Sequence, residues 1–404
     1  MLIASFYFKN DRASKNTRNL PLNSAVNRAK RETIANSDVT TLEALKVSPC
    51  GNGQFKTSEG SCQNWLTCKD IKQQITFSKE NLIGQGMTKM VYLAEYQGKA
   101  VVVSIRNKNN KDRWGDFKEN IENLKKMQNI GGDGDNFNSE NKAITLIGSC
   151  NDRILVTEYH KRGTLKELLA NEEEYKQNFS TLPDRLNLLL EYVKSINFIH
   201  TFDSSPRVYC DSNKLDGTTK QFLLTDNNKL VMSDMDDIPL VKAENGDKAS
   251  ASCKHPEFLY NRQDILSEGF LAPEQKFGEN QGQEFILGKD VAPKIDERSD
   301  IYKIADVAAH ILLGGGNFDN PNTSIRRSSN ISENDNNQKR SSLEEQAYNV
   351  LYESDHRLSN LLKACRSELP ENRPSSERLI NAIESVIESY QVEQSLEESS
   401  FDLL

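Results

Sequence analysis

The sequence lacks the features that mark several common classes of protein. It contains no run of about 20 apolar residues, so the chain as given is not expected to cross a membrane. Residues 1–8 are apolar but too short for the core of a signal peptide with its usual flanks. The net charge of -8 argues against nonspecific nucleic-acid binding, and no nucleic-acid partner is expected.

The seven cysteines do not form a metal-binding pattern, because Cys62 and Cys68 lack a second pair of ligands at the spacing of a zinc site. Cys50, Cys62 and Cys68 instead indicate a disulfide-stapled stem ahead of the main domain. Cys150 and Cys365 are expected to be buried thiols of the core. The sequence leaves the pairing of these cysteines open.

The chain of 404 residues is long enough for a two-lobed domain with a substantial core and tails. Residues 1–48 are polar and Asn-rich, which predicts a flexible arm, and the cysteine-containing stem covers residues 49–77. The main domain is expected over residues 78–390, followed by an acidic tail over residues 391–404. Within the domain, residues 314–342 are rich in Asn, Ser and Gly and predict a disordered insertion.

Residues 207–239 carry the strongest chemical signal. Two short apolar runs separated by Asp-Asn-Asn predict a β-hairpin, with Asp211 before it and Asp234 after it. In a protein-kinase core, an acid of the catalytic loop receives the proton of the substrate hydroxyl, and the acid of the D-F-G triplet binds metal. The alternative is that both acids are ordinary turn residues of a surface hairpin.

The catalytic loop departs from the kinase pattern H-R-D-x-x-x-x-N, because the fifth residue after Asp211 is Asp216. Counted back from Asp234, the residue directly before the first hairpin strand is Gln221, where kinases carry the metal-binding Asn. The loop is therefore expected to be enlarged. Gln keeps the amide oxygen that a hard cation binds, so Gln221 is a candidate metal ligand.

The stretch before the third predicted strand fits a glycine-rich loop. Gly84, Gly86 and Val91 match the pattern G-x-G-x-x-G-x-V that covers the ATP phosphates, but Lys89 stands at the third glycine. The third strand carries Ser104 where kinases have the lysine that pairs with the phosphates. Lys89 could replace that cation, because a flexible ammonium on this loop can reach the same cleft. The alternative is that Lys89 is solvated and the domain is a dead kinase.

Two further stretches fit the first lobe of a kinase. Residues 118–128 predict the C-helix, with Glu119 or Glu122 as possible partners of a lysine, although solvated acids among lysines are the favoured interpretation. Residues 157–165 resemble the hinge between the lobes. Backbone groups there, at Glu158 among others, would contact adenine.

Later elements fit the second lobe. Residues 182–200 predict the long buried helix that precedes the catalytic loop, with His200 as a packing residue. Glu274 lies in a match to the A-P-E element, and Arg373 is its expected ion-pair partner. Asp300 stands where kinases place a buried acid that holds the catalytic loop.

The order of these elements is more specific than any one of them. It predicts an α+β, bilobal, protein-kinase-like fold. The small β-rich N-lobe is expected over residues 78–160, and the larger helical C-lobe over residues 161–390.

The chain resembles the protein O-mannose kinase family, secretory-pathway kinases once classed as pseudokinases, in the runs CQNWLTC, LIGQGMTKMVYLAEY, VYCDSN, SDMDDIP and GFLAPEQ. The resemblance implies ATP and Mg²⁺ as cofactors and phosphate transfer to the 6-hydroxyl of mannose. The acceptor would be an O-linked GalNAc-GlcNAc-Man trisaccharide on dystroglycan-type glycoproteins. It further implies a type II membrane protein of the endoplasmic reticulum lumen, whose anchor is not visible in this sequence. The alternatives are a pseudokinase scaffold and a protein Ser/Thr or Tyr kinase.

The resemblance also assigns roles to single residues. It implies that Lys89 binds the phosphates, that Asp211 is the catalytic acid, and that Asp234 binds metal. Gln221 as a second metal ligand is an inference from its position. Asn213, in the shared C-D-S-N run, is another candidate for the metal or phosphate site.

A disulfide is expected between Cys210 and Cys253. Cys210 stands where kinases have the Arg of H-R-D, which ties the catalytic loop to a phosphorylated activation segment, and Cys253 lies in that segment. The bond would be a covalent substitute for that charge pair. Only an oxidising compartment would maintain it.

Overall fold

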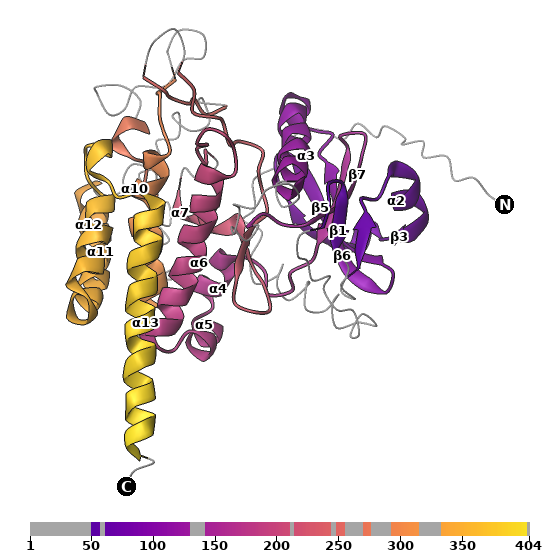
Figure 1. The fold of residues 1–404 in the computed structure, drawn as a ribbon. Helices are drawn as coiled ribbons and strands as arrows, with labels where there is room; N and C mark the ends of the chain where they lie inside the picture. Colours follow the sequence, from indigo (N-terminus) through magenta and orange to yellow (C-terminus); the bar gives the residue numbers. More distant parts are fainter. Residues whose placement is uncertain are drawn as a thin grey trace, which may run out of the picture.

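The computed structural model describes residues 50–56, 61–129, 142–210, 214–243, 248–254, 270–275, 292–314 and 333–401. These residues form two lobes, a smaller N-terminal lobe with a curled antiparallel sheet and a larger, mainly helical C-terminal lobe (Figure 1). The predicted bilobal α+β fold is therefore confirmed. Within the described part of the chain, no helix is both long and apolar enough to cross a membrane.

The N-lobe sheet has the strand order β3-β5-β6-β8-β7, with β4 added beside β5. Its strands are β3 (Ile75–Thr76), β4 (Leu82–Gln85), β5 (Lys89–Tyr96), β6 (Lys99–Arg106), β7 (Leu146–Cys150) and β8 (Ile154–Glu158). Val101 and Val103 alternate along β6 and are fully buried in the core of this lobe. Helix α3 (Trp114–Asn129) buries Phe117, Ile121 and Leu124, which recur on one face of the helix.

The stem belongs to the N-lobe. Strands β1 (Gln54–Lys56) and β2 (Cys62–Asn64) form a hairpin, and helix α2 (Cys68–Gln74) leads into β3. Disulfides join Cys50 to Cys62 and Cys68 to Cys150. The prediction of a free thiol at Cys150 was wrong, because the chain at Leu66 bridges to Gly148 of β7 and brings Cys68 beside that strand. Cys365 is a free, buried thiol, as predicted.

The close approach of the stem to β7 predicts a large effect at one glycine. A Cβ added at Gly148 would lie 2.6 Å from Leu66 Cβ and 2.7 Å from Leu66 O. Gly148→Ala is therefore expected to lower the free energy of unfolding by about 1–3 kcal/mol in denaturant titrations. The control is Gly115→Ala in α3, where an added Cβ meets nothing within 4 Å. It should raise the stability by about 0.5–1 kcal/mol, and equal stability of both variants would contradict the close approach.

The C-lobe surrounds helix α6. Its elements are α4 (Leu165–Ala170), α5 (Glu172–Asn178), α6 (Leu182–Thr201), α7 (Leu215–Lys220), β9 (Phe222–Leu224), β10 (Leu230–Met232), α10 (Arg298–Leu313), α11 (Glu333–Ser354), α12 (His356–Cys365) and α13 (Ser376–Phe401). Short 3₁₀ helices cover Lys79–Asn81 and Lys111–Arg113 in the N-lobe and Pro273–Gln275 and Pro370–Asn372 in the C-lobe. Helix α6 begins with a capping box formed by Thr181 and Asp184.

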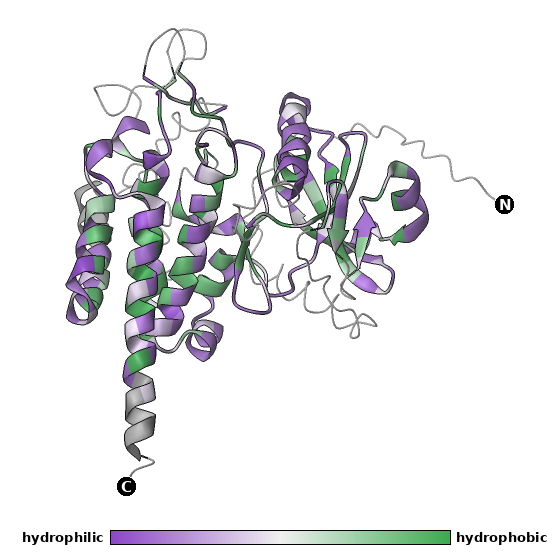
Figure 2. Ribbon diagram, in the orientation of Figure 1, coloured by the Kyte–Doolittle hydropathy of each residue, from purple (hydrophilic) through white to green (hydrophobic). Residues whose placement is uncertain are grey.

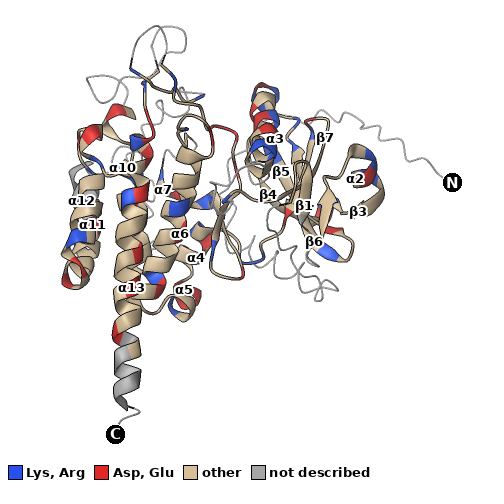
Figure 3. Ribbon diagram, in the orientation of Figure 1, with Lys and Arg blue, Asp and Glu red and all other residues tan. Residues whose placement is uncertain are grey.

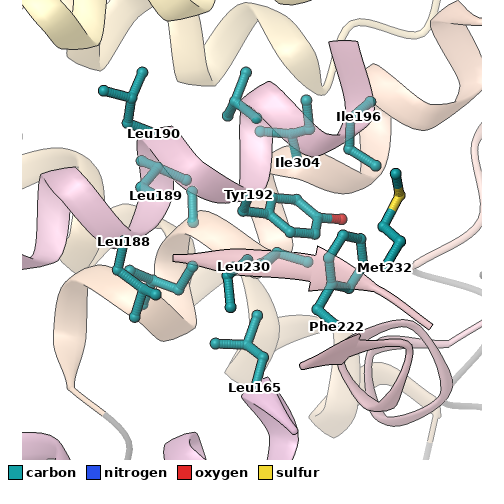
Figure 4. Close-up of a cluster of buried hydrophobic side chains, with 14 of the residues drawn as sticks. Leu165, Leu188, Leu189, Leu190, Tyr192, Ile196, Phe222, Leu230, Met232 and Ile304 are labelled. Atoms are coloured by element: carbon teal, nitrogen blue, oxygen red, sulfur yellow. The ribbon is translucent and has the colours of Figure 1, made fainter. Parts of the chain in front are cut away.

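The C-lobe core reaches the β9–β10 hairpin. Tyr192 of α6 packs on Phe222 of β9 with ring centroids 4.9 Å apart, and Met232 of β10 lies in the same cluster (Figure 4). Figure 2 shows hydrophobic residues concentrated in the sheet and along α6, and mostly hydrophilic residues on α3. The hairpin predicted from the sequence is thus anchored on the helix that precedes the catalytic loop.

Two domain boundaries differ from those expected. Helix α11 begins at Glu333, inside the predicted insertion of residues 314–342, and α13 continues to Phe401, past the predicted start of the tail at residue 391. The sequence at the start of α11 is polar and carries no apolar periodicity, so it gave no signal of a helix. The predicted arm over residues 1–48 lies outside the described residues.

Candidate active site

The site centres on a contact between the two lobes. Lys89, the first residue of β5, places its Nζ 3.0 Å from Asp234 Oδ2, with both side chains mostly buried. Asp234 follows β10, which is joined to the N-lobe by backbone hydrogen bonds from Met232 N to Lys142 O (2.7 Å) and from Ile144 N to Met232 O (2.8 Å). The two lobes thus bring together a cation and an acid that the sequence singled out separately.

The turn between β4 and β5, which we call the glycine turn, positions Lys89. Gly84 pairs with Val91 across β4 and β5, and the turn closes with a hydrogen bond from Gly86 N to Lys89 O (2.8 Å). On the neighbouring strand β6, Ser104 is buried directly opposite Val91. Because that position offers a hydroxyl and no charge, Lys89 supplies the positive charge at Asp234 here.

Two asparagines fasten the glycine turn, and sequence reasoning missed both. Asn107 Nδ2 donates to Gly86 O at 3.1 Å, and Asn110 Nδ2 donates to Met87 O at 2.8 Å. Asn107 follows β6 directly, and Asn110 lies in the turn after it. The only signal in the sequence is an Asn-rich turn at the end of that strand, which a loop of any function can have.

An apolar cluster lies between the glycine turn and the hinge. Ile83, Leu93, Ala100 and the hinge residue Tyr159 are buried together, and Val91 packs against them. Three strands and the hinge contribute to this cluster. Ligand pockets in proteins are lined mainly by apolar side chains, so this cluster is a candidate neighbour of an adenine ring.

The side chain of Glu158 already has partners within the protein. Glu158 Oε1 accepts a hydrogen bond from Thr145 N (2.9 Å) and lies 3.2 Å from His160 Nε2. Burial raises the pKa of Glu158, but the nearby His160 and the hydrogen bond from Thr145 outweigh that effect, and the pKa is lowered. A contact of Glu158 with a nucleotide would therefore use its backbone, as the hinge resemblance implied.

Helix α3 approaches the site through asparagines. Asn120 Nδ2 donates to Asp234 Oδ1 (3.1 Å). Glu122, expected to be solvated, pairs with exposed Lys118 at 3.5 Å. Glu119 was also expected to be solvated, and this was wrong, because it forms an ion pair with Lys254 of the activation segment. That partner lies far along the chain, so the local sequence could not indicate it.

The predicted base Asp211 and the candidate ligand Asn213 lie outside the described residues. The chain that leads into them is well fixed, since Val208 N donates to Pro239 O (3.1 Å) and Cys210 N to Asp237 O (3.0 Å). The segment before Asp211 therefore runs beside the residues that follow Asp234.

Asp300 holds this segment from the C-lobe side. It is almost fully buried, and its Oδ2 accepts a hydrogen bond from Tyr209 N at 2.8 Å. The predicted structural role of Asp300 thus has a direct geometric basis. His200, expected to be a packing residue, is buried and also contacts Asp300 Oδ2 through Nε2 at 3.2 Å.

The enlarged catalytic loop folds into helix α7, which ends directly before Gln221. Gln221 O accepts hydrogen bonds from Ser233 N (2.8 Å) and Ser233 Oγ (3.1 Å), so Gln221 lies beside the residue that precedes Asp234. Asp216 of α7 pairs instead with Lys166 and, at 3.0 Å, with Lys220. Burial raises the pKa of Asp216, but the two lysines outweigh it and lower that pKa.

Cys210 and Cys253, the pair named from the sequence, form a disulfide with their Cα atoms 5.5 Å apart. Asp237 lies near both sulfurs and accepts a hydrogen bond from Lys254 N at 3.1 Å. Among the described residues these three side chains have the spacing of a metal site. The sulfurs are bonded to each other, however, so they cannot act as thiolate ligands.

The predicted ion pair of the C-lobe is present. Arg373 is buried and donates from Nη1 and Nη2 to Glu274 Oε1 (2.6 Å) and Oε2 (2.8 Å). Burial raises the pKa of Glu274, but the hydrogen bonds from Arg373 and Ser299 outweigh burial and lower it. This bidentate pair fixes the end of the activation segment to the base of the C-lobe.

Comparison with known proteins finds several relatives that share one name, although no family model matches the chain. The chain is 33% identical over 270 residues to Protein O-mannose kinase of Xenopus laevis, covering 66% of this chain and 69% of the relative. Identity to the human protein of that name is 28% over 345 residues, covering 84% and 81%. The Gallus gallus relative is 32% identical over 269 residues, covering 66% and 68%.

Proposed function

The chain belongs to the protein O-mannose kinase family, and on that premise we propose that it phosphorylates the 6-hydroxyl of mannose in an O-linked GalNAc-GlcNAc-Man trisaccharide. A kinase function with ATP-dependent phosphotransfer follows from the family. The observation that carries the proposal for this chain is the contact of Lys89 with Asp234 across the lobes. It supports an active site in a chain whose third strand lacks the usual lysine.

The residues fit a nucleotide and a hard cation. Asp234 offers a carboxylate and Gln221 an amide oxygen on neighbouring parts of the hairpin, with Asn213 as the other candidate, and oxygen donors of this kind suit Mg²⁺. Bound Mg²⁺ would neutralise charge on the phosphates during transfer. Lys89 would bind the phosphates beneath the backbone of Gly84 and Gly86.

Asp211 is the proposed base. It would accept the proton of the mannose hydroxyl, and a base must be held within hydrogen-bond reach of that proton. Asp300 fixes Tyr209 N, two residues before Asp211, and the Cys210–Cys253 disulfide fixes the residue directly before it. These supports would keep the base in place without a phosphorylated activation segment.

The proposed acceptor is a glycoprotein such as dystroglycan, in the lumen of the endoplasmic reticulum. Three disulfides among the described residues support an oxidising compartment. The proposed type II membrane anchor rests on the family alone. Positive and negative residues are interspersed along α3 (Figure 3), in agreement with an acceptor that is not a nucleic acid.

The decisive experiment is transfer of labelled phosphate from ATP to a synthetic GalNAc-GlcNAc-Man trisaccharide by the purified protein. Wild type should label the mannose 6-hydroxyl, and Asp211→Asn should reduce kcat by roughly 10²- to 10⁴-fold. The control is Asp226→Asn, at the exposed turn of the same hairpin, which should leave kcat unchanged. Folded wild type that binds ATP but labels no glycan would contradict the proposal and favour a pseudokinase. Labelling of peptides instead would favour a protein kinase.

A further inference from the structure

Asn120 makes two hydrogen bonds that fix the direction of its amide. Its Oδ1 accepts from Met235 N at 3.1 Å, and its Nδ2 donates to Asp234 Oδ1 at 3.1 Å. Because a backbone N–H can only donate, the oxygen of Asn120 must face Met235, and the NH₂ group must face Asp234. Asn120 is almost completely buried, so water does not compete for these bonds.

Each carboxylate oxygen of Asp234 therefore has a nitrogen donor beside it. Oδ1 accepts from Asn120 of α3, and Oδ2 lies 3.0 Å from Lys89 Nζ of β5. A carboxylate held by two donors from different elements has little freedom to rotate. Its remaining lone pairs keep a constant direction.

Asn123, one turn further along α3, provides a natural comparison. Its Nδ2 donates to Met235 O at 2.7 Å, and it is also buried. Asn120 and Asn123 thus hold the two polar groups of the Met235 backbone. Of these two residues, only Asn120 hydrogen-bonds to Asp234.

The charge of the site explains why an amide is suitable at position 120. An acid there would place a second negative charge within hydrogen-bond distance of Asp234, and the two carboxylates would repel each other. No acid is required to hold a lysine, because Lys89 contacts Asp234 directly. The neighbouring acids of α3, Glu119 and Glu122, pair with Lys254 and Lys118 instead.

We propose that Asn120 is a positioning residue for Asp234, fixing the direction of its carboxylate oxygens for the bound divalent cation. This inference rests on the proposed function only in that Asp234 binds metal. In other kinases a lysine on the third strand pairs with a glutamate on the C-helix, whereas here Lys89 and Asn120 both contact Asp234. The prediction is that Asn120 controls metal dependence, whereas Asn123 contributes to stability alone.

The test compares Asn120→Leu with Asn123→Leu in the full chain. Calorimetry measures ATP binding as a function of Mg²⁺ concentration, and thermal unfolding is followed in parallel. Both variants should unfold at lower temperature, because each leaves a Met235 backbone group unpaired. Asn120→Leu should also raise the half-saturating Mg²⁺ concentration about tenfold or more, as expected for loss of a hydrogen bond to a charged group. Asn123→Leu should leave it unchanged.

A second variant covers the case in which Asn120→Leu does not fold. Asn120→Asp keeps the acceptor for Met235 but places a carboxylate beside Asp234. Loss of the donor to Asp234 should raise the half-saturating Mg²⁺ concentration of this variant, as in Asn120→Leu. A wild-type-like Mg²⁺ dependence of this variant would overturn the inference.

The outcomes separate this inference from the proposed function. Calorimetry needs no glycan acceptor, so a failure of mannose phosphorylation by wild type leaves the metal test intact. Equal shifts in Mg²⁺ dependence for the Asn120 and Asn123 variants would reduce Asn120 to a structural role and overturn the inference. Absence of Mg²⁺-dependent ATP binding in wild type would also overturn it, because Asp234 would then have no metal to hold.

Discussion

Lys89→Met is expected to lower kcat/KM for phosphate transfer by roughly 10²- to 10³-fold, the loss typical of removing one charge-stabilising donor from an active site. The physical reason is that β6 carries buried, uncharged Ser104 where kinases have their lysine, so Lys89 provides the charge in contact with Asp234. Methionine keeps the length and apolar stem of the side chain, so the glycine turn should remain intact. Initial rates with the trisaccharide, at several ATP concentrations, would measure the loss.

Two further variants make this result specific to Lys89. Lys89→Arg keeps the charge but changes its shape, and it should retain an intermediate rate. Lys118→Met removes an exposed lysine of α3 and should have no effect on the rate. Full activity of Lys89→Met would show that another group provides the positive charge.

Loss of the Cys210–Cys253 disulfide is expected to reduce both stability and rate. The bond closes a loop of 43 residues, which corresponds to about 4 kcal/mol in the loop-entropy description of disulfides. It also directly precedes the proposed base, and a displacement of about 1 Å at a reacting group can cost about 10²-fold in rate. The double variant Cys210→Ser and Cys253→Ser should therefore unfold at lower denaturant concentration and show a lower kcat.

The disulfide of the stem is the matched control. Cys50 and Cys62 close a loop of 12 residues in the N-lobe, whereas the β9–β10 hairpin belongs to the C-lobe. Their double replacement by serine should reduce stability by about 3 kcal/mol on the same description while kcat stays the same. If both double variants lose activity in proportion to their stability, the Cys210–Cys253 bond has no special role in placing the base.

The contacts around α3 have a consequence for regulation. In kinases activated by phosphorylation, new charge pairs order the activation segment. Here Lys254 follows Cys253 directly and binds Glu119 of α3 as well as Asp236 O at 2.8 Å. The Cys210–Cys253 disulfide thus connects the activation segment to the catalytic loop, and the ion pair of Lys254 with Glu119 connects it to α3. We therefore expect the protein to be active without phosphorylation of its activation segment.

The sequence by itself determined the local elements and the chemical identity of the main site residues. Two short apolar runs separated by turn residues predicted β9 and β10, and a periodic apolar pattern with an early proline predicted α6. These signals are reliable because they depend on neighbours along the chain. The acid after the hairpin and the lysine of the glycine loop were recognisable for the same reason, since each has a fixed place relative to its strand.

The tertiary structure alone decided three contacts between distant residues. The contact of Lys89 with Asp234, the role of Asn120 and the Cys68–Cys150 disulfide all join segments from different parts of the chain. An asparagine in a polar helix has no distinguishing pattern, and its partner is set by how α3 packs over the chain after β10. Such contacts depend on the packing of whole elements, whereas sequence periodicity records only which face of each element is buried.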